Sequence, residues 1–243
     1  MVALRASLFG ALLVGACAVG ESRPAIASGS PAPAWAPVRL RDLIVTSGQA
    51  QPMSDARSAR ATPPELSSDQ FRIAAPTFRA WVGRESRSAV ELDFAYLGAT
   101  ETDAPLGSGE LRRQIGLELR AQDSCNVLYV MWRIAPTARL MVSLKSNPGQ
   151  RQHSECRDRG YINLEPERSA PLPPLRQGER HVLSASLLPA AKASDLELEV
   201  KVDGVSLWRG VLPAGAAALA GPVGLRSDNG QFDVRLRAGS TSP

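Results

Sequence analysis

Two neighbouring stretches of the chain carry polar and aromatic side chains at alternating positions. Glu118 and Arg120 belong to the first stretch, and Tyr129 and Arg133 belong to the second. If both stretches are β-strands, the alternation places these four side chains on one face of a sheet, opposite the core. Arginines can donate hydrogen bonds to sugar hydroxyls or to acidic sugars, and a tyrosine ring can stack on a sugar ring. The four residues therefore form a candidate carbohydrate-binding face.

A structural role for the same face is the alternative. Arg120 and Arg133 could pair with Glu118 and Asp93 on the sheet surface, and Trp132 could lie in the core instead of stacking on a ligand. The spacing of the residues is the same in both cases, so both interpretations stay open.

A polar loop at residues 152–161 follows these stretches and is the densest cluster of polar residues in the chain. It contains His153 and Arg157. If Cys156 pairs with Cys125, the loop lies beside the sheet, and His153 and Arg157 could form one wall of a ligand groove. The alternative is a surface loop that a disulfide holds in place.

The chain has three cysteines, Cys17, Cys125 and Cys156. Cys17 ends an apolar N-terminal segment that we interpret below as an export signal, so two cysteines remain, and an exported protein most simply pairs them. A Cys125–Cys156 bridge closes a loop of about 30 residues, which the chain-entropy model values at roughly 3 kcal/mol. Two cysteines with only His153 nearby do not form a zinc site, and no acidic run has the spacing of a calcium loop. We predict no metal site and no cofactor.

The elements that position these residues are predicted from hydrophobic periodicity. Apolar and polar residues alternate in five stretches, at residues 90–95, 115–120, 140–145, 196–203 and 232–237. A period of two is typical of half-buried strands. Residues 126–134 are apolar on both faces, which predicts a central strand covered on both sides.

Turn residues separate several of these stretches. Asp203-Gly204 and Asn229-Gly230 lie between apolar runs and suit two-residue hairpin turns. Many short strands joined in this way predict an all-β fold, an antiparallel β-sandwich or jelly roll.

Several segments resemble strands of concanavalin A-like lectin and glucanase domains, including laminin-G-like and 3-keto-disaccharide hydrolase-type modules. Residues 198–208 contain a strand, an Asp-Gly turn and a strand, residues 221–226 have the sequence GPVGLR, and residues 232–236 have the sequence FDVRL. Residues 89–94 resemble an early strand of this superfamily, and residues 126–133 resemble its central strand, which ends in a groove-facing arginine. The resemblance covers about residues 68–238 and implies a concanavalin A-like jelly roll, a fold that many functions share.

Laminarinase-type β-glucanases of this superfamily carry the pattern Glu-x-Asp-x-(x)-Glu on one strand. Here Glu91 and Asp93 match the first two acids, but Ala95 and Tyr96 stand where the third should be. Because glycoside hydrolysis needs two carboxylates across the scissile bond, we assign no catalytic residue. A sugar-active enzyme of the 3-keto-disaccharide hydrolase type is one alternative to a binding role, and a purely structural domain is another.

The N-terminus carries the pattern of an export signal. An apolar segment at residues 6–16 follows Arg5, and its length of about 11 residues is too short for a membrane-spanning helix, which needs roughly 20. The run LLVGAC at residues 12–17 resembles the lipobox of bacterial lipoproteins, which implies cleavage before Cys17 and lipidation of Cys17. By the same resemblance, Ala18 favours the outer membrane. Cleavage by an ordinary signal peptidase, without lipidation, is the alternative.

This interpretation divides the chain into three parts. Residues 1–16 form a signal peptide, residues 17–67 form the lipidated N-terminus and a tether rich in proline and serine, and residues 68–243 form the jelly-roll domain. An apolar island at residues 38–45 interrupts the tether and could dock on the domain.

The expected location is the outer membrane or the periplasm, with the lipid anchor as the only attachment to a membrane. The net charge of +4 comes from scattered arginines, and no basic cluster is interleaved with aromatic residues, which argues against a nucleic-acid partner. The expected partner is a glycan or an envelope protein, and the expected role is binding without catalysis.

Overall fold

The structure is a computed structural model that describes residues 33–53, 68–192 and 195–240. The predicted signal peptide and Cys17 lie outside the described residues, as do residues 54–67 of the predicted tether. Within the described ranges, no helix is both long enough and apolar enough to cross a membrane.

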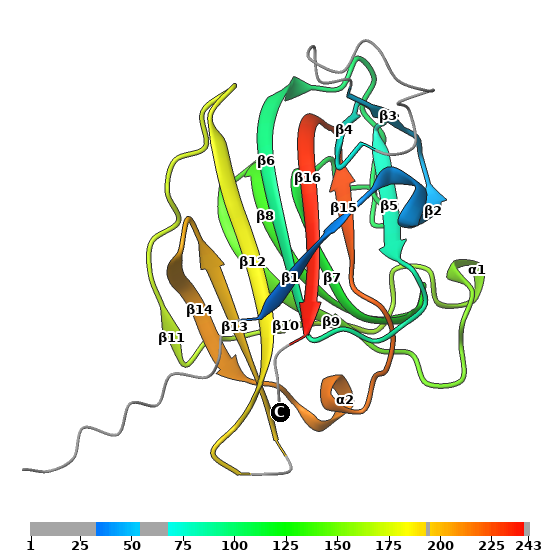
Figure 1. The fold of residues 1–243 in the computed structure, drawn as a ribbon. Helices are drawn as coiled ribbons and strands as arrows, with labels where there is room; N and C mark the ends of the chain where they lie inside the picture. The colour runs from blue at the N-terminus through cyan, green and yellow to red at the C-terminus, as the bar shows by residue number, and fades with distance from the viewer. Residues whose placement is uncertain (1–32, 54–67, 193–194, 241–243) are drawn as a thin grey trace, which may run out of the picture. The chain divides into compact units, whose positions relative to one another are not determined.

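Two antiparallel sheets lie face to face as two layers (Figure 1). The strands of the nine-stranded sheet, in spatial order, are β11 (Arg168–Ser169), β14 (Val205–Val211), β13 (Leu196–Val202), β12 (Arg180–Pro189), β6 (Ala89–Ala99), β16 (Gly230–Ser240), β4 (Gln70–Ile73) and β3 (Ala50–Pro52), with β1 (Ala34–Val38) also paired to β16. The strands of the seven-stranded sheet are β10 (Tyr161–Leu164), β9 (Arg139–Lys145), β8 (Asn126–Ala135), β7 (Arg113–Asp123), β15 (Gly224–Asp228), β5 (Thr77–Val82) and β2 (Leu43–Ser47). This arrangement confirms the predicted antiparallel β-sandwich jelly roll.

Three single-turn helices complete the described part of the chain: η1 (Leu40–Asp42), α1 (His153–Cys156) and α2 (Ala214–Ala217). The loop that carries α1 is tied to the start of β8 by a disulfide between Cys125 and Cys156. The predicted pairing of these two cysteines is therefore confirmed.

The core lies between the two sheets and contains the apolar half of each alternating strand. Trp132 and Phe94 meet there edge to face, with ring centroids 5.5 Å apart, and both are fully buried. Trp132 is therefore a core residue and not a platform for a sugar. Strand β8 is buried from Asn126 to Arg133, which confirms the prediction of a central strand covered on both faces.

Of the two predicted hairpin turns, one is confirmed and the other is wrong. Asp203 and Gly204 have positive φ angles of 51° and 81° and join the paired strands β13 and β14, as expected for a hairpin. Asn229 also has a positive φ, of 54°, but it joins β15 of one sheet to β16 of the other. The prediction of a hairpin there is wrong, because a turn signal does not specify which sheet the next strand enters.

The sandwich also includes residues that we assigned to the tether. Strands β1 and β3 pair with the nine-stranded sheet, and β2 pairs with β5 of the other sheet. The apolar island at residues 38–45 spans the end of β1, η1 and the start of β2. Residues 33–53 therefore belong to the domain, because their backbone groups complete the edges of both sheets.

Candidate functional site

Alternation along the seven-stranded sheet leaves one set of side chains facing away from the core. Strand register arranges this outer set into rows. One row consists of Arg79, Arg226, Gly116, Met131 and Met141. The next row consists of Trp81, Gly224, Glu118, Tyr129, Ser143 and Asn163. These rows bring together residues from six strands.

Two adjoining cavities lie over these rows. One, of about 310 Å³, is bounded by the loop before β7 and by the loop that carries α1; we call it the basic cavity. The other has a volume of about 350 Å³. Because Arg79, Tyr129 and His153 line both cavities, we treat them as one site, the outer-face cleft.

A buried polar network forms part of the floor of the basic cavity. The Asp228 carboxylate accepts hydrogen bonds from Arg226 Nε at 2.8 Å, from Arg226 Nη2 at 3.2 Å and from Gln114 Nε2 at 2.7 Å. All three residues are buried. Since a buried charge is tolerated only when it is paired and hydrogen-bonded, the network holds Arg226 in one position.

Two tyrosines and an arginine form a stack beside this network. The Tyr129 and Tyr161 rings are nearly parallel, with centroids 6.0 Å apart, and the Arg226 guanidinium carbon lies 5.3 Å from the centre of the Tyr129 ring. Burial raises the pKa of Tyr129, so its phenol stays neutral at physiological pH. Tyr129 is buried, whereas Tyr161 is 43% exposed, and within the basic cavity the Tyr161 ring is the aromatic surface that a ligand can reach.

Glu118 lies at the other end of the cleft and is 2% exposed. Its Oε2 accepts a 2.7 Å hydrogen bond from Trp81 Nε1. Burial raises the pKa of Glu118, although Arg79 and Arg226 oppose the shift. A carboxyl group that is buried and held in this way is a poor ligand donor.

Lys145 fixes the loop that walls the cleft. Its Nζ donates to the carbonyl oxygens of Ser124 at 3.1 Å and Arg157 at 2.6 Å, and it lies 5.3 Å from the centre of the Tyr161 ring. The side chain is fully buried, and burial lowers the pKa of Lys145 to about 8. Lys145 thus acts with the Cys125–Cys156 bridge to position the loop.

His153 and Arg157 both line the basic cavity from this loop. Burial, together with the positive charges of Lys145 and Arg79, lowers the pKa of His153. The loop therefore stands at the wall of a cleft, and a role of either residue in ligand binding stays a prediction.

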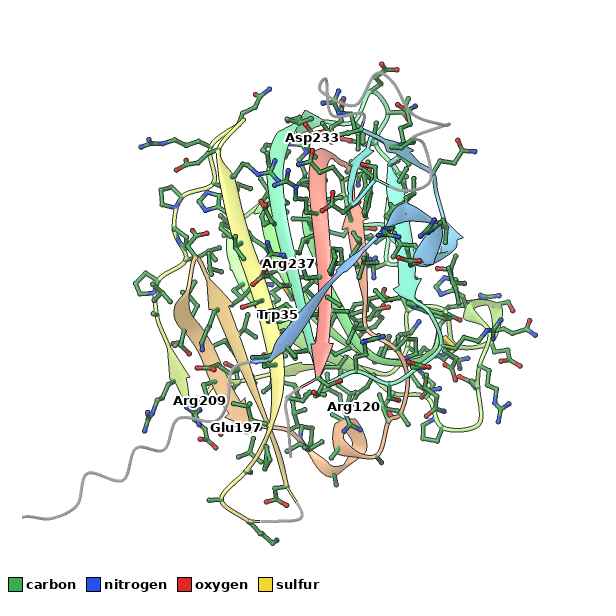
Figure 2. The ribbon with its side chains drawn as sticks, viewed as in Figure 1. Trp35, Arg120, Glu197, Arg209, Asp233 and Arg237 are labelled. Carbon is green, nitrogen blue, oxygen red and sulfur yellow. A yellow bond between two sulfur atoms is a disulfide. The ribbon has the colours of Figure 1, made fainter. Side chains whose placement is uncertain are left out.

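Arg120 does not share the face of Glu118, contrary to the sequence prediction. A bulge between Leu119 and Asp123 and a positive φ of 50° at Arg120 break the alternation. Its Nη1 donates to the carbonyl oxygens of Ala217 and Leu219, and Figure 2 shows Arg120 beside α2. Arg120 caps a helix turn and does not line the cleft.

The prediction that Arg133 faces a ligand groove is also wrong, for a different reason. It has the expected orientation but is 4% exposed, 3.7 Å from the Glu110 carboxylate, and it lines neither cavity. The loop before β7 covers it. A groove-facing arginine at the end of the central strand, as the resemblance implied, is not found.

The acidic pair considered for hydrolysis lies on the other sheet. Asp93 pairs with Arg180 at 2.8 Å, and Glu91 pairs with Arg237 at 3.1 Å, both on the outer face of the nine-stranded sheet. In the cleft, Asp158 lines the basic cavity, and Glu118 and Asp123 line the adjoining cavity. No group of His, Cys, Asp and Glu in the described ranges is arranged to hold a metal ion.

The comparisons with known proteins give neighbours by fold only. No family model matches the chain, and no curated protein matches it in sequence. Among solved structures, the chain is similar to the galectin LEC-6 of Caenorhabditis elegans, with 12% identity, a TM-score of 0.40, and coverage of 71% of this chain and 96% of that one.

Two further neighbours have similar scores. The metal-free carbohydrate recognition domain of Emp46p has 8% identity and a TM-score of 0.46, over 84% of this chain and 90% of that one. LamAcat from Zobellia galactanivorans has 10% identity and a TM-score of 0.44, over 72% of this chain and 79% of that one. At these identities and TM-scores the similarity supports no conclusion about the family or the activity of the chain.

Most of the cationic side chains of the cleft were not predicted from the sequence. Arg79, Arg226 and Arg139 line the basic cavity, and the prediction named none of them. The signal available was alternation, since Arg79 lies between Phe78 and Ala80 and faces away from the core. Their convergence could not be seen, because β5, β15 and β9 are distant in sequence and meet only through the sheet order.

Proposed function

We propose that the chain binds carbohydrate in the outer-face cleft, without a chemical step of its own. The observation that carries the proposal is Tyr161, whose partly exposed ring stacks on Tyr129 and lines the basic cavity. Sugars have an apolar face and a rim of hydroxyls, so they suit a site with one accessible ring and several polar groups. Ser143 and Asn163 line the same cavity and supply polar groups of this kind.

The alternative of a purely structural domain is not favoured by the position of the apolar island at residues 38–45. That alternative requires the candidate face to be apolar or filled by residues 38–45. The lining of the basic cavity is largely polar, and no residue of this segment lines either cavity of the cleft.

The binding proposal is tested by titration calorimetry of the full chain against neutral and acidic oligosaccharides. We expect at least one oligosaccharide to bind, Tyr161→Ala to weaken that binding about tenfold through loss of stacking, and Tyr161→Phe to retain it. Val205→Ala, at an exposed position of β14 on the other sheet, is the matched control and should bind like the wild type. Absence of binding across the panel would refute the proposal and leave an envelope protein as the expected partner.

We also propose that the chain is exported and held at the outer membrane or in the periplasm through a lipid on Cys17. Two observations support this location: the lipobox-like run that ends at Cys17, and a disulfide, which persists in oxidising compartments. Mass spectrometry of the mature protein should find a lipidated Cys17 at its N-terminus. A mature N-terminus at Ala25 or Ser28 without lipid would contradict the anchor.

A further inference from the structure

The basic cavity is lined by five arginines and one acidic residue, Asp158. The arginines come from five separate segments of the chain, namely β5, the loop before β7, β9, the loop after α1, and β15: Arg79, Arg112, Arg139, Arg157 and Arg226. The excess of positive charge is therefore created by the tertiary fold and not by a basic run in the sequence.

Two of the five arginines already have carboxylate partners. Arg226 is bound to Asp228, and Arg112 is paired with Glu110, which also lies close to Arg133. For Arg79, Arg139 and Arg157, no carboxylate of the described residues lies within ion-pair distance. Three guanidinium groups thus face one cavity without a carboxylate at ion-pair distance, and the charges of Glu118 and Glu110 act on Arg79 and Arg139 only from farther away.

Arg79 is the most unfavourable of the three to leave unpaired. It is the direct cross-strand partner of Arg226, and like charges directly opposite each other destabilise a sheet. Its Nε is also buried without a hydrogen-bond partner, whereas nearly all buried donors in proteins have one. An anion bound at the Arg79 guanidinium would supply a counter-charge at close range.

The opposite face of the molecule shows that this sequence can pair its arginines. On the outer face of the nine-stranded sheet, carboxylates stand next to arginines in four ion pairs: Arg72–Asp233, Arg180–Asp93, Arg237–Glu91 and Arg209–Glu197. Figure 2 shows Arg237 and Asp233 on β16 of that sheet, on the side toward the viewer. The unpaired arginines of the cavity therefore contrast with these four paired arginines of the other sheet.

From this contrast we propose that the saccharide bound in the outer-face cleft is acidic and that its carboxylate binds in the basic cavity at Arg79. This inference rests on the proposed function and specifies its ligand class as uronic-acid-containing oligosaccharides. A carboxylate can accept two parallel hydrogen bonds from one guanidinium group, and the ring that carries it can stack on Tyr161. Arg139 and Arg157 line the same cavity and add positive potential around that position.

The test compares acidic oligosaccharides with neutral counterparts of the same shape. Oligosaccharides of galacturonic, glucuronic and mannuronic acid, and the carboxyl-reduced form of each, are titrated into the full chain by calorimetry. We expect at least one acidic form to bind about tenfold or more tightly than its reduced form, with the difference shrinking as salt is raised. Arg79→Gln should remove most of the difference, while Arg72→Gln, the control in an exposed ion pair of the other sheet, should leave it unchanged.

The possible outcomes separate the inference from the function it rests on. Equal or tighter binding of the reduced forms would overturn the acidic-ligand inference and leave carbohydrate binding intact. Binding of neither form of any oligosaccharide would overturn carbohydrate binding itself. If sodium sulfate or phosphate bound as tightly as the acidic oligosaccharides, the cavity would be a site for small anions and the saccharide assignment would fail.

Discussion

Arg79 on β5 and Arg226 on β15 stand directly opposite each other on the outer face of the seven-stranded sheet. Of the two, Arg226 has a direct ion pair, through the two hydrogen bonds that it donates to Asp228. The sheet therefore holds one arginine in a closed, buried pair and presents the next one to a cavity. This asymmetry assigns different roles to two adjacent cations: Arg226 stabilises the floor of the cleft, and Arg79 is available to a ligand.

Replacement of Arg226 by methionine should destabilise the fold strongly. Asp228 is 1% exposed and would keep only the hydrogen bond from Gln114, so a buried carboxylate would lose its counter-charge. We expect a loss of about 3–5 kcal/mol in the free energy of unfolding, measured by urea denaturation. The double variant Arg226→Met with Asp228→Asn should recover part of the loss, and a loss below about 1 kcal/mol in the single variant would contradict the importance of the pair.

Glu118→Gln should make the protein's stability less dependent on pH. Burial raises the pKa of Glu118 in the folded state. Its contribution to the free energy of unfolding is therefore most favourable below the pKa that the group has in the unfolded chain, and it is lost as pH rises through the pKa of the folded state. The glutamine amide oxygen can still accept from Trp81 without carrying charge. Relative to the wild type, the variant should therefore gain stability in denaturation experiments as pH rises from the ordinary glutamate pKa of 4.5 through the raised pKa of the folded state.

At pH values above the raised pKa of Glu118, the same variant should also bind acidic oligosaccharides more tightly, since it removes a carboxylate whose charge acts on the site of Arg79 and Arg226. A gain of about two- to tenfold is expected by calorimetry. Weaker binding of the acidic forms by Glu118→Gln would mean that Glu118 itself contacts the ligand.

Lys145 should make the folded state more stable as pH rises in the alkaline range, which is the opposite of the effect of Glu118. Burial lowers its pKa from 10.5 to about 8, so above about pH 8 the folded state binds fewer protons than the unfolded state and stability rises with pH. The stability of the wild type relative to Lys145→Met should therefore increase between about pH 7 and about pH 10. A constant difference across this range would show that Lys145 titrates with its ordinary pKa.

Loss of the disulfide should weaken both the fold and the cleft wall. The bridge spans a sequence separation of 31 residues and holds the loop of His153 and Arg157 against β8. For Cys125→Ser with Cys156→Ser, we expect a loss of about 3 kcal/mol in urea denaturation and weaker saccharide binding. Reducing agent should reproduce both effects in the wild type and have no effect on the double variant. If binding is unchanged in the variant, the loop does not contribute to the site.

The elements of this fold could be predicted from local patterns, and the cleft could be predicted only in part. Periodicity identified the strands, and the Asp203-Gly204 turn has the predicted φ angles, because these features depend on neighbouring residues. The face of Arg120 was wrong because one bulge after Leu119 reverses the alternation. Arg79 and Arg226 could not be paired from the sequence, because they are brought together by the order of strands in the sheet.

The most direct test of the proposed binding site is a crystal structure of the chain with the oligosaccharide that binds most tightly in the titrations. We expect a sugar ring stacked on Tyr161 and an acidic group within hydrogen-bond distance, about 2.7–3.2 Å, of the Arg79 guanidinium. A ligand bound elsewhere, for example on the outer face of the nine-stranded sheet among the Arg72–Asp233 and Arg237–Glu91 pairs, would contradict it.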